Sequence, residues 1–121
     1  MGEGIERREA PRTALPRRPR VKAREVQEVR LLDLSLKGAR IEHLDLLRPG
    51  APCHLQLPPT LGSLSLSAQV VWCTVIGRKP SSDGNRQLVS RTGLRFTKLT
   101  ATQETTLAGT LQELAAGRVP A

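Results

Sequence analysis

Aromatic side chains are scarce in this chain of 121 residues. It contains one Trp, one Phe and no Tyr, so that aromatic residues make up 2% of the sequence. Proteins that bind single-stranded nucleic acid commonly stack the bases on aromatic side chains. The composition therefore disfavours that class of binding, although charge alone leaves double-stranded targets open.

Long apolar runs and paired cysteines are also missing. No run approaches the ~18 apolar residues of a transmembrane helix, and the N-terminus has no apolar core of a signal peptide. Cys53 and Cys73 are two isolated thiols, an arrangement that suits a reducing compartment. We therefore expect a cytoplasmic protein that does not insert into a membrane.

The residue groupings of an enzyme or a metal site are not apparent. His43 and His54 have no Cys or carboxylate at the spacing of metal ligands. Cys53 directly precedes His54, but neighbours on a strand point to opposite faces, which argues against a nucleophile–base pair. Four carboxylates likewise show no pairing for acid–base work: Glu25, Glu28, Glu42 and Asp45. The sequence predicts a protein that binds, with no catalytic residue, metal or cofactor.

The charge of the chain is strongly positive. Its formal net charge is +8 and its pI is about 11.0. Residues 1–24 alone hold eight Arg or Lys against three Glu. A charge of this size predicts an anionic partner, such as a phosphate, a nucleic acid or a membrane lipid.

The first 20 residues differ in composition from the rest. They contain Pro11, Pro16 and Pro19 and few apolar side chains. Proline interrupts helices and favours an extended conformation in the residue before it. We expect a flexible basic arm over residues 1–20, which has little to bury, and a folded domain over residues 21–116.

Period-two alternation of apolar and polar residues dominates the folded part. It predicts strands that are separated by short turns, as in a small antiparallel barrel. The predicted strands span residues 20–24, 26–33, 38–43, 53–57, 64–75 and 87–96. Trp72, the one tryptophan, is expected to fill the core from the longest of these strands.

The C-terminal region has the pattern of a helix. Thr100 or Thr102 can cap its start, and Gly117 is placed to end it. Leu107, Leu111 and Leu114 fall on one face of such a helix. The fold class is therefore mainly β with one C-terminal helix.

Two short motifs stand out against this background. Arg8 and Arg12 are spaced RxxxR in the basic arm, and Asp33, Ser35 and Gly38 form a DxSxxG turn between two predicted strands. Asp and Ser side chains can bond nearby backbone N–H groups, and Gly allows a positive φ or close approach by a ligand. A turn that only caps itself is the commoner fate of such a hexapeptide.

Together, in this order, the motifs resemble those of the PilZ domain, a bacterial receptor for cyclic di-GMP. Gly93-Leu94-Arg95-Phe96 is similar to the closing strand of that family, and the resemblance runs from about Glu6 to Leu114. It implies a six-stranded barrel with a packed C-terminal helix. It also implies that six residues bind cyclic di-GMP: Arg7, Arg8, Arg12, Asp33, Ser35 and Gly38. In this family, an arginine at the place of Arg7 accompanies binding of an intercalated ligand dimer.

Arginine suits such a ligand because its planar fork bonds phosphate oxygens or O6 and N7 of guanine. We expect the arm to order over the ligand, with Arg8 and Arg12 facing Asp33 and Ser35, so that a downstream protein recognises the new surface. Two alternatives stay open. The chain could bind nucleic acid through phosphates, or it could be an adaptor of the PilZ type that contacts only proteins.

Overall fold

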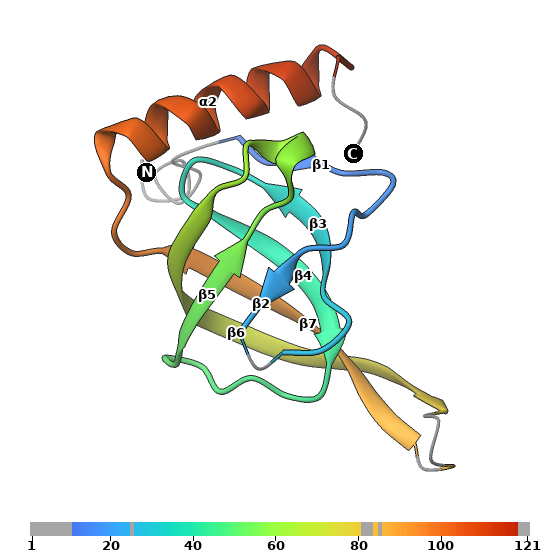
Figure 1. Cartoon of the computed structure of the whole chain (residues 1–121). Coiled ribbons are helices and arrows are strands. Elements are labelled where there is room, and N and C mark those ends of the chain that lie inside the picture. The colour runs from blue at the N-terminus through green and yellow to red at the C-terminus, as the bar shows by residue number, and fades with distance from the viewer. Residues whose placement is uncertain (1–10, 25, 81–83, 85, 119–121) are drawn as a thin grey trace, which may run out of the picture.

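A computed structural model of the chain describes residues 11–24, 26–80, 84 and 86–118. Within these residues, seven antiparallel strands form one sheet that curls into a barrel, and helix α2 lies across one end of it (Figure 1). The strands follow one another across the sheet in the order β1 (Thr13–Ala14), β3 (Arg30–Leu34), β4 (Gly38–Leu44), β7 (Arg86–Phe96), β6 (Ser65–Pro80), β5 (Pro52–Gln56) and β2 (Lys22–Ala23). A 3-10 turn, η1 (Pro59–Leu61), joins β5 to β6, and the helix is α2 (Ala101–Ala115). The expectation of a mainly β barrel with a C-terminal helix is confirmed.

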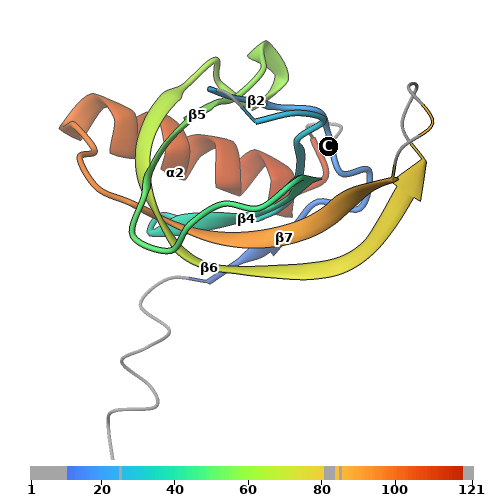
Figure 2. The same cartoon turned by 90° about the horizontal axis from the view of Figure 1, so that it is seen from below.

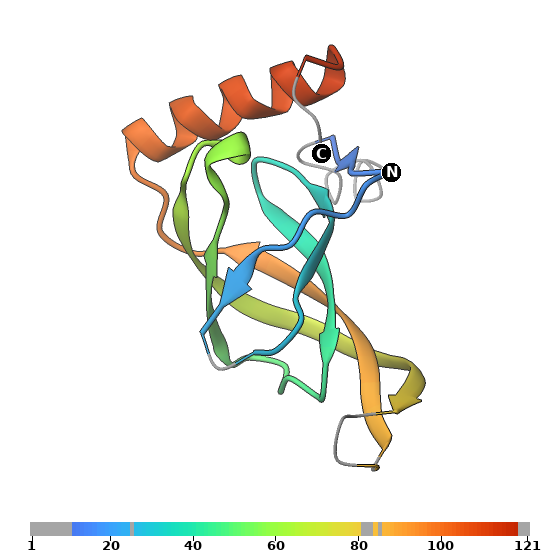
Figure 3. The same ribbon diagram turned by 45° about the vertical axis from the view of Figure 1, so that its right-hand side comes forward.

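The segment before β2 closes the barrel. Val21 N donates to Val29 O at 3.1 Å, and Leu31 N donates to Pro19 O at 3.0 Å. The next two residues form β2, which pairs with β5 on the opposite edge of the sheet. One short stretch therefore bonds to both edges, and Figure 3 shows it running from the β3 side to β5. Closure in this way leaves few unpaired backbone groups along the two edges.

Leucine and other aliphatic side chains fill the barrel. Inward positions on β6 alternate with outward ones up to Val70, as period two requires. The fully buried aliphatic side chains come from most elements of the fold: Leu31, Leu34, Ile41, Leu55, Leu61, Leu66 and Leu107. The core is therefore continuous from the sheet to α2.

The structure corrects the predicted arm over its second half. Residues 13–14 form β1, which pairs with β3 and adds a seventh strand to the six expected. Leu15 is only 2% exposed, and its N–H donates to Leu32 O at 3.0 Å. The prediction that residues up to 20 have little to bury is wrong here, because Leu15 enters the core. The folded unit thus begins before residue 21.

Two strands extend further than the sequence predicts. β6 runs to Pro80 and β7 starts at Arg86, so that residues 77–80 and 86, which were expected in a loop over 77–86, belong to a ribbon projecting from the barrel (Figures 1 and 2). Trp72 lies on β6 and is 38% exposed, so it is not part of the core. A register shift between Val70 and Trp72 breaks the alternation of β6 and turns the ring outward. The core role predicted for Trp72 is therefore wrong.

The helix follows its prediction closely. Thr100 is the N-cap, and Thr100 and Gln103 bond each other through side chain and backbone in a capping box. Leu107 is fully buried, while Leu111 and Leu114 are partly buried against the core. Within the residues described, no helix is both long and apolar enough to cross a membrane.

The buried position of Leu15 generates a test of where the folded unit begins. Leu15→Ala should lower the free energy of unfolding by about 2–4 kcal/mol, because it removes a fully packed side chain. Leu36→Ala is the matched control, since Leu36 is 38% exposed and its truncation should cost less than about 1 kcal/mol. Urea denaturation measures both. An unchanged midpoint for Leu15→Ala would mean that the barrel folds without residues 11–20.

Candidate functional site

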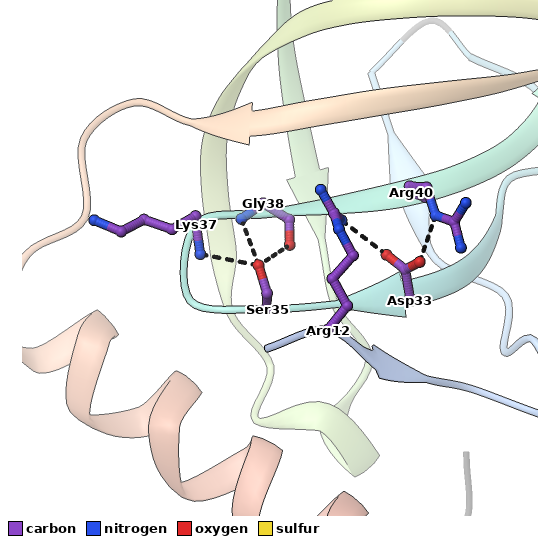
Figure 4. Close-up of polar contacts among 6 residues, drawn as sticks. All are labelled: Arg12, Asp33, Ser35, Lys37, Gly38 and Arg40. Carbon is purple, nitrogen blue, oxygen red and sulfur yellow. Dashed lines mark hydrogen bonds and ion pairs between the residues drawn. The ribbon is translucent and has the colours of Figure 1, made fainter. Parts of the chain in front are cut away.

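The Asp33 carboxylate lies between two arginines, one just before β1 and one on β4. Asp33 is near the end of β3 and is 2% exposed. Arg12 Nη1 donates to its Oδ1 at 3.0 Å, and Arg40 Nε bonds its Oδ2 (Figure 4). The side chains of Arg12 and Arg40 are themselves 50% and 47% exposed. A buried acceptor is thus flanked by two guanidinium groups that still reach solvent.

This arrangement has a clear chemical capacity. A guanidinium group carries five N–H donors in a rigid fork. Arg12 and Arg40 each commit one nitrogen to Asp33, so further donors on each fork are available to an incoming group. The site can therefore bind a planar or tetrahedral group that offers several acceptors, such as a base edge or a phosphate.

Ser35 holds the turn that follows. Its Oγ accepts from the N–H groups of Lys37 at 3.1 Å and Gly38 at 3.2 Å. The same hydroxyl lies 3.3 Å from Gly38 O, to which Ser35 N also donates at 2.9 Å. Figure 4 shows the contacts of the Ser35 hydroxyl with Lys37 and Gly38. In this structure Ser35 acts as the self-capping residue that the sequence allowed as an alternative.

Gly38 is required for a different reason from the one expected. It is absent from the glycines with positive φ, and its N–H bonds Ser35 instead of standing open to a ligand. A Cβ added here would collide with the backbone carbonyl of Leu94 on β7. The missing side chain therefore lets β4 and β7 approach closely, and the expectation of a positive φ at Gly38 is wrong.

Arg40 was missed from the sequence. It pairs directly with Asp33 across the β3–β4 hairpin, and opposite charges at facing positions of antiparallel strands attract. Both strands and the turn between them were predicted, but the register that sets Arg40 opposite Asp33 comes only from the fold.

One row across four strands extends the site. Arg40 faces Gly93 on β7, and Gly93 faces Trp72 on β6. The Trp72 ring lies where a side chain on Gly93 would otherwise be. The row therefore runs from the paired carboxylate to a partly exposed aromatic ring, on the outer face of the sheet.

The predicted lack of catalytic groups can be compared with the side-chain positions. Cys53 is buried, and burial raises the pKa of its thiol; the neighbouring His54 is exposed. These two side chains point to opposite faces of β5, as expected. Among the residues described, no three His, Cys, Asp or Glu side chains are grouped so that they could hold a metal ion.

The predicted site lies apart from the best-defined cavity of the described part of the chain. A cavity of about 620 Å³ opens beside β2, where Arg20, Lys22, Arg24 and His54 contribute to its walls. Of the predicted site residues that the structure describes, none lines it. Arg7 and Arg8 lie outside the described part of the chain, so that the structure brings together Arg12, Asp33, Ser35 and Gly38 of the predicted set.

Comparison with known proteins can now be set beside this geometry. The family model of the PilZ domain matches residues 6–113. The chain belongs to the PilZ domain family. No curated protein matches it.

Two solved structures share the fold of this PilZ domain. One is the PilZ domain of YcgR from Escherichia coli with c-di-GMP, which has a TM-score of 0.66 and 19% identity; the match covers 92% of this chain and 93% of that one. The other is MrkH, described as a c-di-GMP-dependent transcription regulatory factor, with a TM-score of 0.65 and 15% identity. The second match covers 88% of this PilZ domain and 50% of MrkH.

The contact between β4 and β7 generates a test of the Gly38 assignment. Gly38→Ala should lower the free energy of unfolding by about 2–3 kcal/mol, since the added methyl group forces two strands of the PilZ domain apart. Gly109→Ala supplies the control: Gly109 lies in α2 with open space around it, and Ala there should stabilise by about 0.5–1 kcal/mol. Thermal melts compare the two. Equal, small changes in thermal stability for the two variants would show that no clash with β7 excludes a side chain at residue 38.

Proposed function

We propose that this PilZ domain is a receptor for cyclic di-GMP and binds it on the outer face of the sheet at Asp33. The observation that carries the proposal is the buried Asp33 carboxylate between the half-exposed Arg12 and Arg40. Guanine offers acceptors at O6 and N7 and donors along its Watson–Crick edge. Arginine forks meet the acceptors, and a carboxylate accepts from the donors.

The phosphates of the ligand provide the second part of the argument. Cyclic di-GMP is a dianion, and the chain has a net charge of +8. Arginine donors that are not engaged with Asp33 can bond phosphate oxygens bidentately. Membership of the PilZ family and the likeness to the YcgR domain, which was solved with c-di-GMP, support this ligand class.

The remaining predicted residues have distinct parts in the proposal. Arg7 and Arg8 supply further cations to the ligand from the segment before Arg12. Ser35 and Gly38 complete the site at the turn, where their mutual hydrogen bonds keep Asp33 in position. No chemical step is involved, and the domain acts by binding.

Signalling follows from a change in surface. The ligand brings Arg7 and Arg8 to the face that already carries Arg12, and a partner protein recognises the surface so formed. Because β1 and the buried Leu15 already join the sheet, the ligand-dependent change is confined to residues 7–12. Ordering these residues costs free energy, so that affinity is lower than the contacts alone would give.

Calorimetric titration tests the ligand and the residues together. Cyclic di-GMP should bind more tightly than cyclic di-AMP, because adenine presents a donor where guanine O6 accepts. Arg12→Ala and Arg40→Ala should each lose about 1–3 kcal/mol of binding free energy. The control is Arg17→Ala, which removes an exposed charge of the same segment that contacts neither Asp33 nor the turn.

Three results would contradict the proposal. Equal losses for all three variants would mean that the segment acts as a diffuse cation. Equal heats for the two dinucleotides would exclude base recognition. No heat for either would favour the nucleic-acid or adaptor alternatives.

Amide hydrogen exchange tests the proposed change of surface. Cyclic di-GMP should slow exchange in residues 7–12 far more than in β5 and the barrel part of β6. The reason is that those strands are already hydrogen-bonded to neighbouring strands in the free fold. Protection that rises equally throughout the chain would indicate general stabilisation by a ligand, and the proposed local change would then be wrong.

A further inference from the structure

A second carboxylate lies between two arginines on the same face of the sheet. Arg91 Nε donates to Glu42 Oε1 at 3.1 Å, and Arg18 Nη1 lies 3.8 Å from the same oxygen. Glu42 faces Arg91 across the β4–β7 pair. Arg18 belongs to the turn before β2, where its N–H donates to Leu15 O at 2.9 Å. The sequence had suggested no pairing for Glu42.

This second cluster repeats the first one. Glu42 is two residues beyond Arg40 on β4, and residues at that spacing share a face about 7 Å apart. The side chains of Arg18 and Arg91 are 51% and 39% exposed, similar to the arginines around Asp33. The Glu42 side chain is 25% exposed, so its oxygens are more accessible than those of Asp33.

The ion pairs of this second cluster contribute little to the stability of the fold. Ion pairs with this exposure contribute little to folding. The backbone of Arg18 also has a φ of 45°, a left-handed conformation that is uncommon for a residue with a side chain. The turn nevertheless holds Arg18 beside Glu42, within the reach of an ion pair.

The chemistry of the repeat matches a ligand with two guanines. Each cluster combines a carboxylate acceptor with two arginine donors, which complement the Watson–Crick edge and the O6 and N7 atoms of one guanine. We propose that Glu42, with Arg18 and Arg91, forms a second guanine subsite beside the one at Asp33. This proposal rests on the proposed function above. The base comes either from the same cyclic di-GMP molecule or from a second one.

Cyclic GMP–AMP, in which one guanine is replaced by adenine, is the decisive probe. Calorimetric titration of the whole chain should show that cyclic di-GMP binds roughly tenfold to a hundredfold more tightly than the hybrid. Glu42→Ala should reduce this ratio to less than about threefold, and Arg91→Ala should reduce it as well. The ratio is the readout because removing a carboxylate also raises the attraction for every anionic ligand.

Glu28→Ala is the matched control. It changes the net charge by the same amount, but Glu28 lines the cavity beside β2, bonds Lys79 and contacts neither cluster. The ratio between the two dinucleotides should stay as in the unaltered chain. Thermal melts of all variants establish that they fold. If Glu42→Ala does not fold, Arg91→Ala still provides the test.

Each outcome decides a separate question. If the unaltered chain binds neither dinucleotide, the proposed function fails and the subsite fails with it. If it binds both equally, or if Glu42→Ala and Arg91→Ala leave the ratio unchanged, the subsite is overturned while the proposed function stands. If these variants lose the preference for cyclic di-GMP, the stoichiometry of binding identifies the source of the second base. One ligand per chain assigns the second guanine to the same molecule, and two ligands per chain assign it to a second molecule.

Discussion

The pairing of Asp33 is the interaction on which the candidate site depends. Removing a carboxylate from water is costly unless cations and hydrogen bonds replace its hydration. Asp33 obtains both from Arg12, just before β1, and from Arg40 on β4. Because these arginines come from opposite sides of β3, the same contacts help to join the N-terminal segment to the sheet. The Asp33 carboxylate and its two guanidinium partners therefore both stabilise the fold and provide the groups that can bind a ligand.

Two glycines shape the surface around this ion pair. Gly38 lets the backbones of β4 and β7 approach, and Gly93 leaves room for the Trp72 ring on the next strand. A side chain at Gly93 would displace the Trp72 ring, and a side chain at Gly38 would force β4 away from β7. Arg40 and the Trp72 ring instead lie in one row on the outer face. A cation close to an aromatic ring favours a planar, anionic ligand.

Several features of the fold could be predicted because their signals are local. Alternation located most of the barrel strands, and the cap at Thr100 with the leucines of α2 located the helix. The DxSxxG pattern located the turn at Ser35, whose side chain bonds only within four residues. Trp72 was misplaced because a β-bulge changes the face of a strand without any required residue type. The extent of the N-terminal arm was misjudged because one buried side chain, Leu15, outweighs a polar composition.

The sequence by itself determined the fold class, the turn at Asp33 and the excess of positive charge, since each follows from neighbouring residues or from simple counts. Only the tertiary structure decided which arginines meet the carboxylates. Arg12 and Asp33 are 21 residues apart in the chain, and Glu42 and Arg91 are 49 apart. Strand register and barrel closure bring these groups together, and no spacing along the chain encodes either. For the same reason, only the fold showed that Gly38 serves the contact between two strands, because the carbonyl that excludes a side chain there belongs to β7.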